Sequence, residues 1–111
     1  MKRVLLDENL DRRLKNYFSS ELDVTSVPSL GWQSKKNGEL LAAMKEEGMD
    51  VLLTSDRNLR FQQNLDESGV QVVIILAFDN RLKALINSIE KIEAGILALP
   101  ATAQYVEIDL R

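Results

Sequence analysis

Two carboxylates stand directly behind aliphatic runs that have the composition of buried strands. Asp7 ends the stretch "VLLD" at 4–7, and Asp56 ends the stretch "VLLTSD" at 51–56. In a parallel α/β sheet, ligands bind beyond the carboxyl ends of the strands, so both side chains are expected at one edge. If the two strands lie close together, the carboxylates converge on one cleft. Such a cleft suits a hard, oxygen-binding cation such as Mg²⁺ or Mn²⁺.

A structural role is the alternative for each of these aspartates. An Asp at a strand-to-helix junction is a favoured N-cap, because its side chain accepts from backbone N–H groups of the first helical turn. Asp7 and Asp56 both precede segments with helical patterns. The occurrence of two such strand endings, in a chain with little other catalytic equipment, favours a shared site.

Glu39 is a third candidate for the acidic site. It falls in the first turn of an expected helix, where the helix dipole favours negative charge, so a structural role is equally compatible with its position. Glu8 points away from Asp7 if the strand continues, which predicts a solvated residue or one that only supports the site. Asp79 follows an apolar strand and is interpreted as an ordinary cap before the next helix.

Polar and basic residues near the two aspartates are candidates for substrate binding. Asn9 and Asn58 each lie two residues after one of them, although Asn is also common in turns. Arg57 and Lys36 could contact phosphate groups. Trp32, in the long segment before Lys36, could stack on a base.

Composition limits the chemistry that this chain can perform. The 111 residues suit a single domain, 1–111, and contain neither Cys nor His. Thiolate nucleophiles, disulfides, imidazole bases and histidine-bound metals are therefore excluded. The net charge of −3 argues against strong non-specific binding to nucleic acid. It leaves a metal-dependent nuclease open, since a metal ion can supply local positive charge.

The sequence predicts neither a membrane span nor a secretion signal. No apolar run approaches the roughly 20 residues that a spanning helix needs. The N-terminus "MKRVLLDENL" reaches an acidic pair too soon to contain a signal-peptide core. A cytoplasmic protein is expected.

Strand and helix patterns alternate along the chain. Helices are expected at 10–20, 38–47, 57–67 and 80–97, and a long loop at 28–38. Asn37 is the expected N-cap of the second helix and Gly48 its C-terminal stop. Strands are expected at 2–7, 22–27, 51–54, 70–77 and 104–110. This alternation predicts a three-layer α/β/α fold with a mainly parallel central sheet, because parallel strands are usually joined by helical crossovers.

Three motifs resemble, in the same order, the small single-domain members of the PIN-like family. They are "VLLDENL", "NGELL" and "VLLTSDRNLRFQQNL", and the resemblance covers about residues 2–78. Those members are toxin components of bacterial toxin–antitoxin pairs, related to VapC-type toxins. The resemblance implies a PIN-like fold and metal-dependent RNA cleavage in an acidic cleft that holds Mg²⁺ or Mn²⁺. The acidic positions of the family fall on Asp7, Glu39 and Asp56.

The resemblance also implies the partners of the chain. These are an RNA substrate and a small DNA-binding antitoxin protein, and the last helix with the segment "LALPATAQ" at 97–104 could form the antitoxin groove or a homodimer face. The chain departs from the pattern at Asn37, where many relatives carry Asp. An amide brings no charge to a cation, so the alternative is a catalytically weak or inactive PIN-like interaction module.

A receiver-like phosphoacceptor domain is a less favoured alternative. Such domains also carry an acidic pair after the first strand and an Asp after the third, which would make Asp56 the phosphorylation site. Their chemistry needs a hydroxyl at the end of the fourth strand and a lysine at the end of the fifth. The stretches "IILAF" and "YVEIDLR" supply neither.

Overall fold

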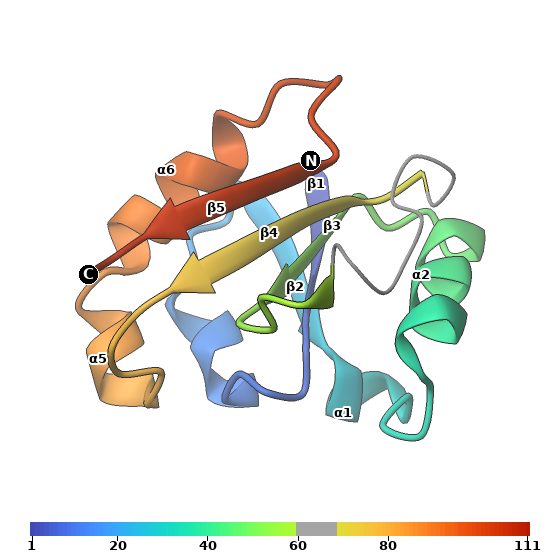
Figure 1. Cartoon of the computed structure of the whole chain (residues 1–111), viewed down its shortest axis with the longest axis horizontal. Helices are drawn as coiled ribbons and strands as arrows, with labels where there is room; N and C mark the ends of the chain where they lie inside the picture. Colours follow the sequence, from blue (N-terminus) through green and yellow to red (C-terminus); the bar gives the residue numbers. More distant parts are fainter. Residues whose placement is uncertain (60–68) are drawn as a thin grey trace.

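Five parallel strands form the centre of the molecule. The computed structural model describes residues 1–59 and 69–111 of the chain, and within them the strand order is β2-β1-β3-β4-β5 (Figure 1). The strands are β1 (Lys2–Leu6), β2 (Leu22–Ser26), β3 (Val51–Thr54), β4 (Gln71–Leu76) and β5 (Tyr105–Asp109). All four neighbouring pairs are parallel. The expected parallel sheet is confirmed, and the strand limits agree with the sequence patterns to within one or two residues.

Helices cover both faces of the sheet, which confirms the three-layer α/β/α architecture. The helical elements are η1 (Arg12–Tyr17), α1 (Val27–Leu30), α2 (Asn37–Glu46), α5 (Leu82–Ile86) and α6 (Ile89–Leu97). Successive side chains of a strand point to opposite faces, so β1 contributes Val4 and Leu6 to one core and Leu5 to the other. The first core includes residues of η1, α5 and α6, and the second includes the buried face of α2.

The segment after β1 is a tighter and shorter helix than the helix expected at 10–20. It is a 3₁₀ helix from Arg12 to Tyr17. Asp11 is its N-cap and accepts from the backbone N–H of Arg13 at 2.9 Å, while Phe18 is already extended. The expected helix is thus present, but its limits were wrong, because the chain is capped at Asp11 and leaves the helical conformation at Phe18.

The long helix expected at 80–97 is broken into α5 and α6. The break lies at Asn87 and Ser88, and Ser88 has φ −112° and ψ 14°. Asn and Ser side chains compete with the helix for backbone hydrogen bonds, which makes this pair a favourable place for a break. After it, α6 continues and buries Ile92 and Ile96.

The connection between β2 and β3 contains two helices. The short helix α1 lies in the expected loop, with the side chain of Ser26 as its N-cap and Pro28 in its first turn. The next helix begins one residue earlier than expected, so its N-cap is Lys36, and the assignment of Asn37 as N-cap was wrong. Gly48, with φ 72°, confirms the expected C-terminal stop.

The helix expected at 57–67 lies outside the described residues from position 60 onward. None of the helices in the described part of the chain is long and apolar enough to span a bilayer.

Candidate functional site

The carboxyl ends of β1 and β3 meet at the point where the strand order reverses. From β1 the chain goes to β2 on one side, and from β3 it goes to β4 on the other. This order is the flavodoxin-like one, in which ligands bind at the crevice between the first and third strands. The backbone N–H of Asp7 donates to the carbonyl of Leu53 at 2.9 Å, so the β1–β3 pairing continues to Asp7.

Asp7 is held in place by neutral donors at this edge. Its side chain is nearly buried, with 8% of the residue exposed. One carboxylate oxygen, Oδ2, accepts from the hydroxyl of Thr54 at 2.8 Å, and the other, Oδ1, accepts from the backbone N–H of Glu8 at 2.8 Å. A buried carboxylate needs such donors, because desolvation otherwise makes it costly. Asp7 is thus fixed in orientation and caps no helix.

Thr54 connects Asp7 to the other polar residues of the site. Its fully buried hydroxyl accepts from the side-chain amide of Asn9 at 3.1 Å and from the backbone N–H of Asp56 at 3.1 Å. A hydroxyl has one donor and two acceptor positions, so these contacts and the one to Asp7 use its full capacity. The side-chain oxygen of Asn9 also accepts from the backbone N–H of Ser55 at 3.3 Å. Asn9 therefore links the ends of β1 and β3.

Asp56 makes the cap-like contact that the structural alternative predicts. Its Oδ1 accepts from the backbone N–H of Asn58 at 3.0 Å, which is an Asx turn. A carboxylate has about four acceptor positions, so this one bond leaves capacity for a ligand. The hydroxyl of Thr54 thus lies between the carboxylate of Asp7 and the backbone N–H of Asp56, and Asp56 is half-buried.

The other candidates for the site are arranged around this centre. Glu39 is exposed in the first turn of α2, and no contact among the described residues joins it to Asp7 or Asp56. Lys36 is exposed just before α2, and Arg57 and Asn58 are exposed in the turn after β3. Exposed residues of this kind are accessible to a bound substrate.

Glu8 and Asp79 are the two remaining acidic candidates. Glu8 is exposed, and its backbone N–H supports the carboxylate of Asp7. Asp79 accepts from the backbone N–H of Arg81 at 2.9 Å. The N-cap of α5 is Arg81, without a side-chain cap, so the interpretation of Asp79 as the helix cap was wrong and its contact is a local turn before the helix. Trp32 is half-buried against the second core and has the ammonium of Lys35 5.8 Å from its ring centre.

Three Asp-x-Arg pairs recur at or after the carboxyl ends of strands, and the sequence patterns did not predict them. In each, the guanidinium turns back onto the carboxylate two residues earlier. In the first, Arg13 lowers the pKa of Asp11 to about 2 through hydrogen bonds from its side chain and its backbone. The pKa of Asp79 is lowered in the same way by Arg81. The pairs are Asp11 with Arg13, Asp79 with Arg81, and Asp109 with Arg111.

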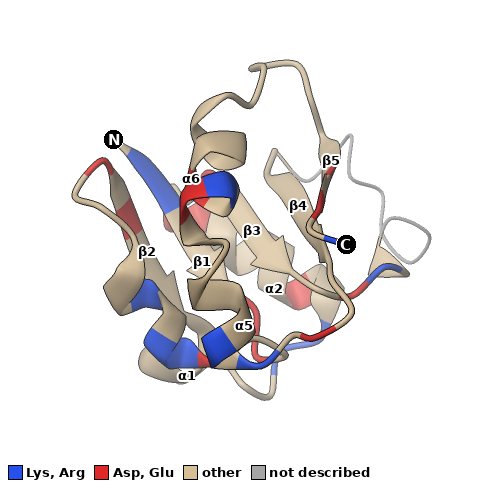
Figure 2. Ribbon diagram, turned by 90° about the vertical axis from the view of Figure 1, so that its left-hand side faces the viewer, with Lys and Arg blue, Asp and Glu red and all other residues tan. Residues whose placement is uncertain are grey.

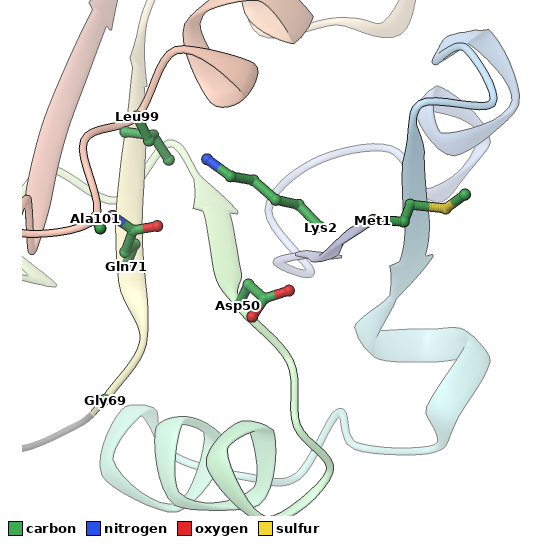
Figure 3. A pocket seen from close by; sticks show the side chains of 7 residues that line it. All are labelled: Met1, Lys2, Asp50, Gly69, Gln71, Leu99 and Ala101. Atoms are coloured by element: carbon green, nitrogen blue, oxygen red, sulfur yellow. The ribbon is translucent and has the colours of Figure 1, made fainter.

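A hollow of about 450 Å³ lies at the opposite, amino-terminal edge of the sheet (Figure 3). Its polar side chains already have partners. Lys2 donates to the carbonyl of Ile96 at 2.9 Å, and Gln71 donates to two carbonyls of the segment after α6. Asp50 accepts from the backbone N–H of Arg3 at 2.8 Å. These contacts close the amino-terminal edge, so the hollow offers few groups to a ligand.

The carboxylate oxygens of Asp7 and Asp56 are the type of ligand atom that a hard cation binds. Within 1–59 and 69–111 no three acidic, His or Cys side chains are grouped so that they could hold a metal ion. Mg²⁺ is commonly held by only one or two protein carboxylates, with waters and substrate phosphates completing its octahedron. One or two carboxylates at this edge are therefore chemically compatible with a cation that is shared with a phosphate substrate.

No family model, curated protein or solved structure matches this chain.

Proposed function

We propose that this protein is a Mg²⁺- or Mn²⁺-dependent endoribonuclease whose cation is held by Asp7 and Asp56. One observation carries the proposal: at the reversal point of the strand order, Thr54 donates to Asp7 Oδ2 at 2.8 Å and accepts from the N–H of Asp56 at 3.1 Å. The PIN-like motifs add the reaction class. They also imply Glu39 as a third ligand, but among the described residues Glu39 is not grouped with Asp7 and Asp56 in a way that could hold a metal ion, so the proposal rests on the two aspartates.

The residues of the chain have distinct roles in this proposal. Asp7 and Asp56 bind the ion, and Thr54 keeps the carboxylate of Asp7 in one orientation. The side-chain amide of Asn9 is hydrogen-bonded to the hydroxyl of Thr54 and to the backbone N–H of Ser55. In this proposal Asn9 therefore positions the ends of the strands rather than the substrate. A bound divalent ion supplies an activated water and neutralises charge on the scissile phosphate.

Exposed residues around the two aspartates orient the RNA. Arg57, Lys36 and Asn58 are all exposed and can contact its phosphates. Phosphate contacts from Lys and Arg fix the register of a nucleic acid without reading its sequence. These three residues are therefore expected to affect the affinity for RNA more than the choice of cleavage site.

The test is cleavage of a mixed RNA pool with Mg²⁺ or Mn²⁺ by the wild type, Asp7→Asn and Asp56→Asn. Each substitution removes one negative charge from a proposed metal ligand. Loss of a residue that only supports such a ligand costs roughly 10- to 100-fold in activity, so loss of the ligand itself should lower the cleavage rate by more than that. Asp23→Asn, an equal change of charge at an exposed position of β2, is the matched control and should cleave like the wild type. Equal rates in all four proteins would sink the assignment.

The biological role in the proposal is that of a toxin in a toxin–antitoxin pair. It follows from the PIN-like motifs, which also imply a small DNA-binding antitoxin as partner. Co-expression with the product of the neighbouring reading frame tests it. A stable complex that suppresses RNA cleavage is the expected result, whereas an unrelated neighbour or an uninhibited mixture contradicts the role.

An inactive interaction module is the second candidate. It is supported by exposed apolar side chains in the described part of the chain, among them Leu97 on α6. It becomes the better account if a partner co-purifies while neither Mg²⁺ nor Mn²⁺ binds. The receiver-like alternative shares the strand order of this sheet. However, this chain lacks the hydroxyl after β4 and the lysine after β5 that receiver chemistry requires. A stable mass gain with acetyl phosphate would revive this alternative.

A further inference from the structure

Phe78 is an aromatic side chain left in water at the carboxyl edge of the sheet. It follows β4 by two residues and is 89% exposed, more than any other large apolar residue in the part of the chain that the structure describes. Phe is among the residues most often buried. The exposed ring is therefore available to contact a ligand.

The ring leaves the same edge of the sheet as Asp7 and Asp56. β3 and β4 are neighbours, with Thr54 paired to Ile74, so the chain at Phe78 continues beyond the carboxyl end of β4 (Figure 1). Adjacent strands are about 4.8 Å apart. The turn that carries Phe78 therefore starts one strand away from the end of β3, and one extended molecule could contact both.

The surroundings of Phe78 are basic rather than apolar. Arg81 places its Nε and one terminal nitrogen 3.0 Å from the two carboxylate oxygens of Asp79, which neutralises that acid. The side chain of Arg81 remains 87% exposed, and Lys83 is exposed beside it. Asp79, Arg81 and Lys83 line, with Ala84 and Asn87, a hollow of about 430 Å³. That volume falls within the roughly 300–1,000 Å³ of small-molecule sites.

Basic and acidic residues both follow the carboxyl ends of the strands, and the acids include Asp7, Glu8, Asp11, Glu39, Asp56 and Asp79. In Figure 2 blue segments lie close together around α1 and on α5, although the net charge of the chain is −3. Local positive charge beside an exposed ring favours a polyanion that carries aromatic groups over an apolar protein surface. The basic residues that follow the carboxyl ends of strands include Arg12, Arg13, Lys15, Lys36, Arg57, Arg81 and Lys83.

We propose that Phe78 is a stacking platform for one base of single-stranded RNA, with Arg81 and Lys83 contacting the adjacent phosphates. This inference rests on the proposed function, since it takes the ligand of the carboxyl edge to be RNA. Aromatic side chains stack on any base, because every base has a π-face. Phe78 would thus hold the strand across the Asp7–Asp56 site without selecting a sequence.

The experiment measures fluorescence anisotropy of a labelled oligouridine in EDTA, so that metal-dependent cleavage cannot interfere. The Phe78→Ala variant should bind roughly 5- to 100-fold more weakly than the wild type, which is the range for loss of one stacked base. Phe78→Trp should keep the wild-type affinity. Leu97→Ala is the matched control, because it truncates another exposed apolar residue, on α6, and should bind normally.

An abasic oligomer with the same backbone separates stacking from other effects. The wild type and Phe78→Ala should bind it equally, because there is no base to stack. Equal affinity of both proteins for the oligouridine, an equal loss on the abasic oligomer, or no RNA binding by the wild type would each overturn the inference. Loss of a co-purifying protein from Phe78→Ala, with RNA binding intact, would make the ring a protein-docking residue instead.

The assay also distinguishes this inference from the proposed function. Stacking without cleavage in Mg²⁺ or Mn²⁺ would contradict the ribonuclease and leave Phe78 as an RNA-binding residue. Cleavage with RNA binding unaffected in Phe78→Ala would contradict only the role of Phe78.

Discussion

At the scale of single residues, Thr54 determines how the site is held together. We predict that Thr54→Val lowers the free energy of unfolding by about 1–3 kcal/mol, because Asp7 loses a donor and the N–H of Asp56 loses its acceptor while the side-chain volume is kept. Urea unfolding measures the change. Thr25→Val on β2, at a half-buried position, is the control. A similar loss in both variants would mean that the hydroxyl contributes nothing specific.

The Asp-x-Arg pairs should make the stability of the folded state depend on pH. The pKa of Asp11 is lowered from 3.8 to about 2, so the folded state favours the charged carboxylate. This contribution to stability is complete above the unfolded pKa and is lost as the pH falls from about 4 toward 2. NMR titration should find the Asp11 carboxyl titrating near 2 in the wild type and closer to its ordinary pKa in Arg13→Ala. A titration near 3.8 in the wild type would contradict the pairing.

Some residues of the site could be predicted from sequence and others could not. The placement of Asp7 and Asp56 at one edge of the sheet followed from two aliphatic runs that each end on a carboxylate. Thr54 was missed because a threonine at the end of a strand has the same pattern whether its hydroxyl faces a core or a site. The exposure of Phe78 was missed because an aromatic residue after an apolar run looks like core.

At the scale of elements, strands were easier to predict than helices. A strand buried on both faces is a continuous aliphatic run, and such a run has clear ends. Helix limits depend on caps and local competition for hydrogen bonds. Asp11, Ser26 and Lys36 proved to be the N-caps of η1, α1 and α2, and the Asn87–Ser88 pair broke a helix that the apolar stripe alone made continuous.

The packing of α6 on β5 gives a prediction for Gly95. A Cβ at this position would lie 2.6 Å from Cδ1 of Ile108. Gly95→Ala gains up to about 1 kcal/mol of helix propensity, but overpacking costs about 1–3 kcal/mol, so a net loss of about 1 kcal/mol is expected. In an Ile108→Val background, which lacks the closest atom, the same change should be neutral or stabilising. Equal effects in the two backgrounds, measured by thermal unfolding, would contradict this account of the contact.

At the scale of the whole molecule, the two cores share one sheet and should unfold together. The Cα radius of gyration is 12.7 Å, close to the roughly 13 Å of a single domain of this length. Circular dichroism and the fluorescence of Trp32, which packs on the second core, should give coincident unfolding transitions. Two separate transitions would contradict the expectation of one domain.

The overall architecture was predictable, but the order of the strands was not. Alternation of strands and helices requires a layered α/β fold and leaves several strand orders open. In the observed strand order β1 lies beside β3, and the proposed site depends on this adjacency. The sequence could state only the condition that the two strands lie close.

The most direct test of the central claim is calorimetric titration of Mn²⁺ into the wild type, Asp7→Asn, Asp56→Asn and Asp23→Asn. We predict that the wild type and Asp23→Asn bind the ion alike. Each of the other two variants should bind at least about tenfold more weakly, since each loses a charged ligand. Equal affinity in all four proteins, or no binding by the wild type, would contradict a cation site between β1 and β3.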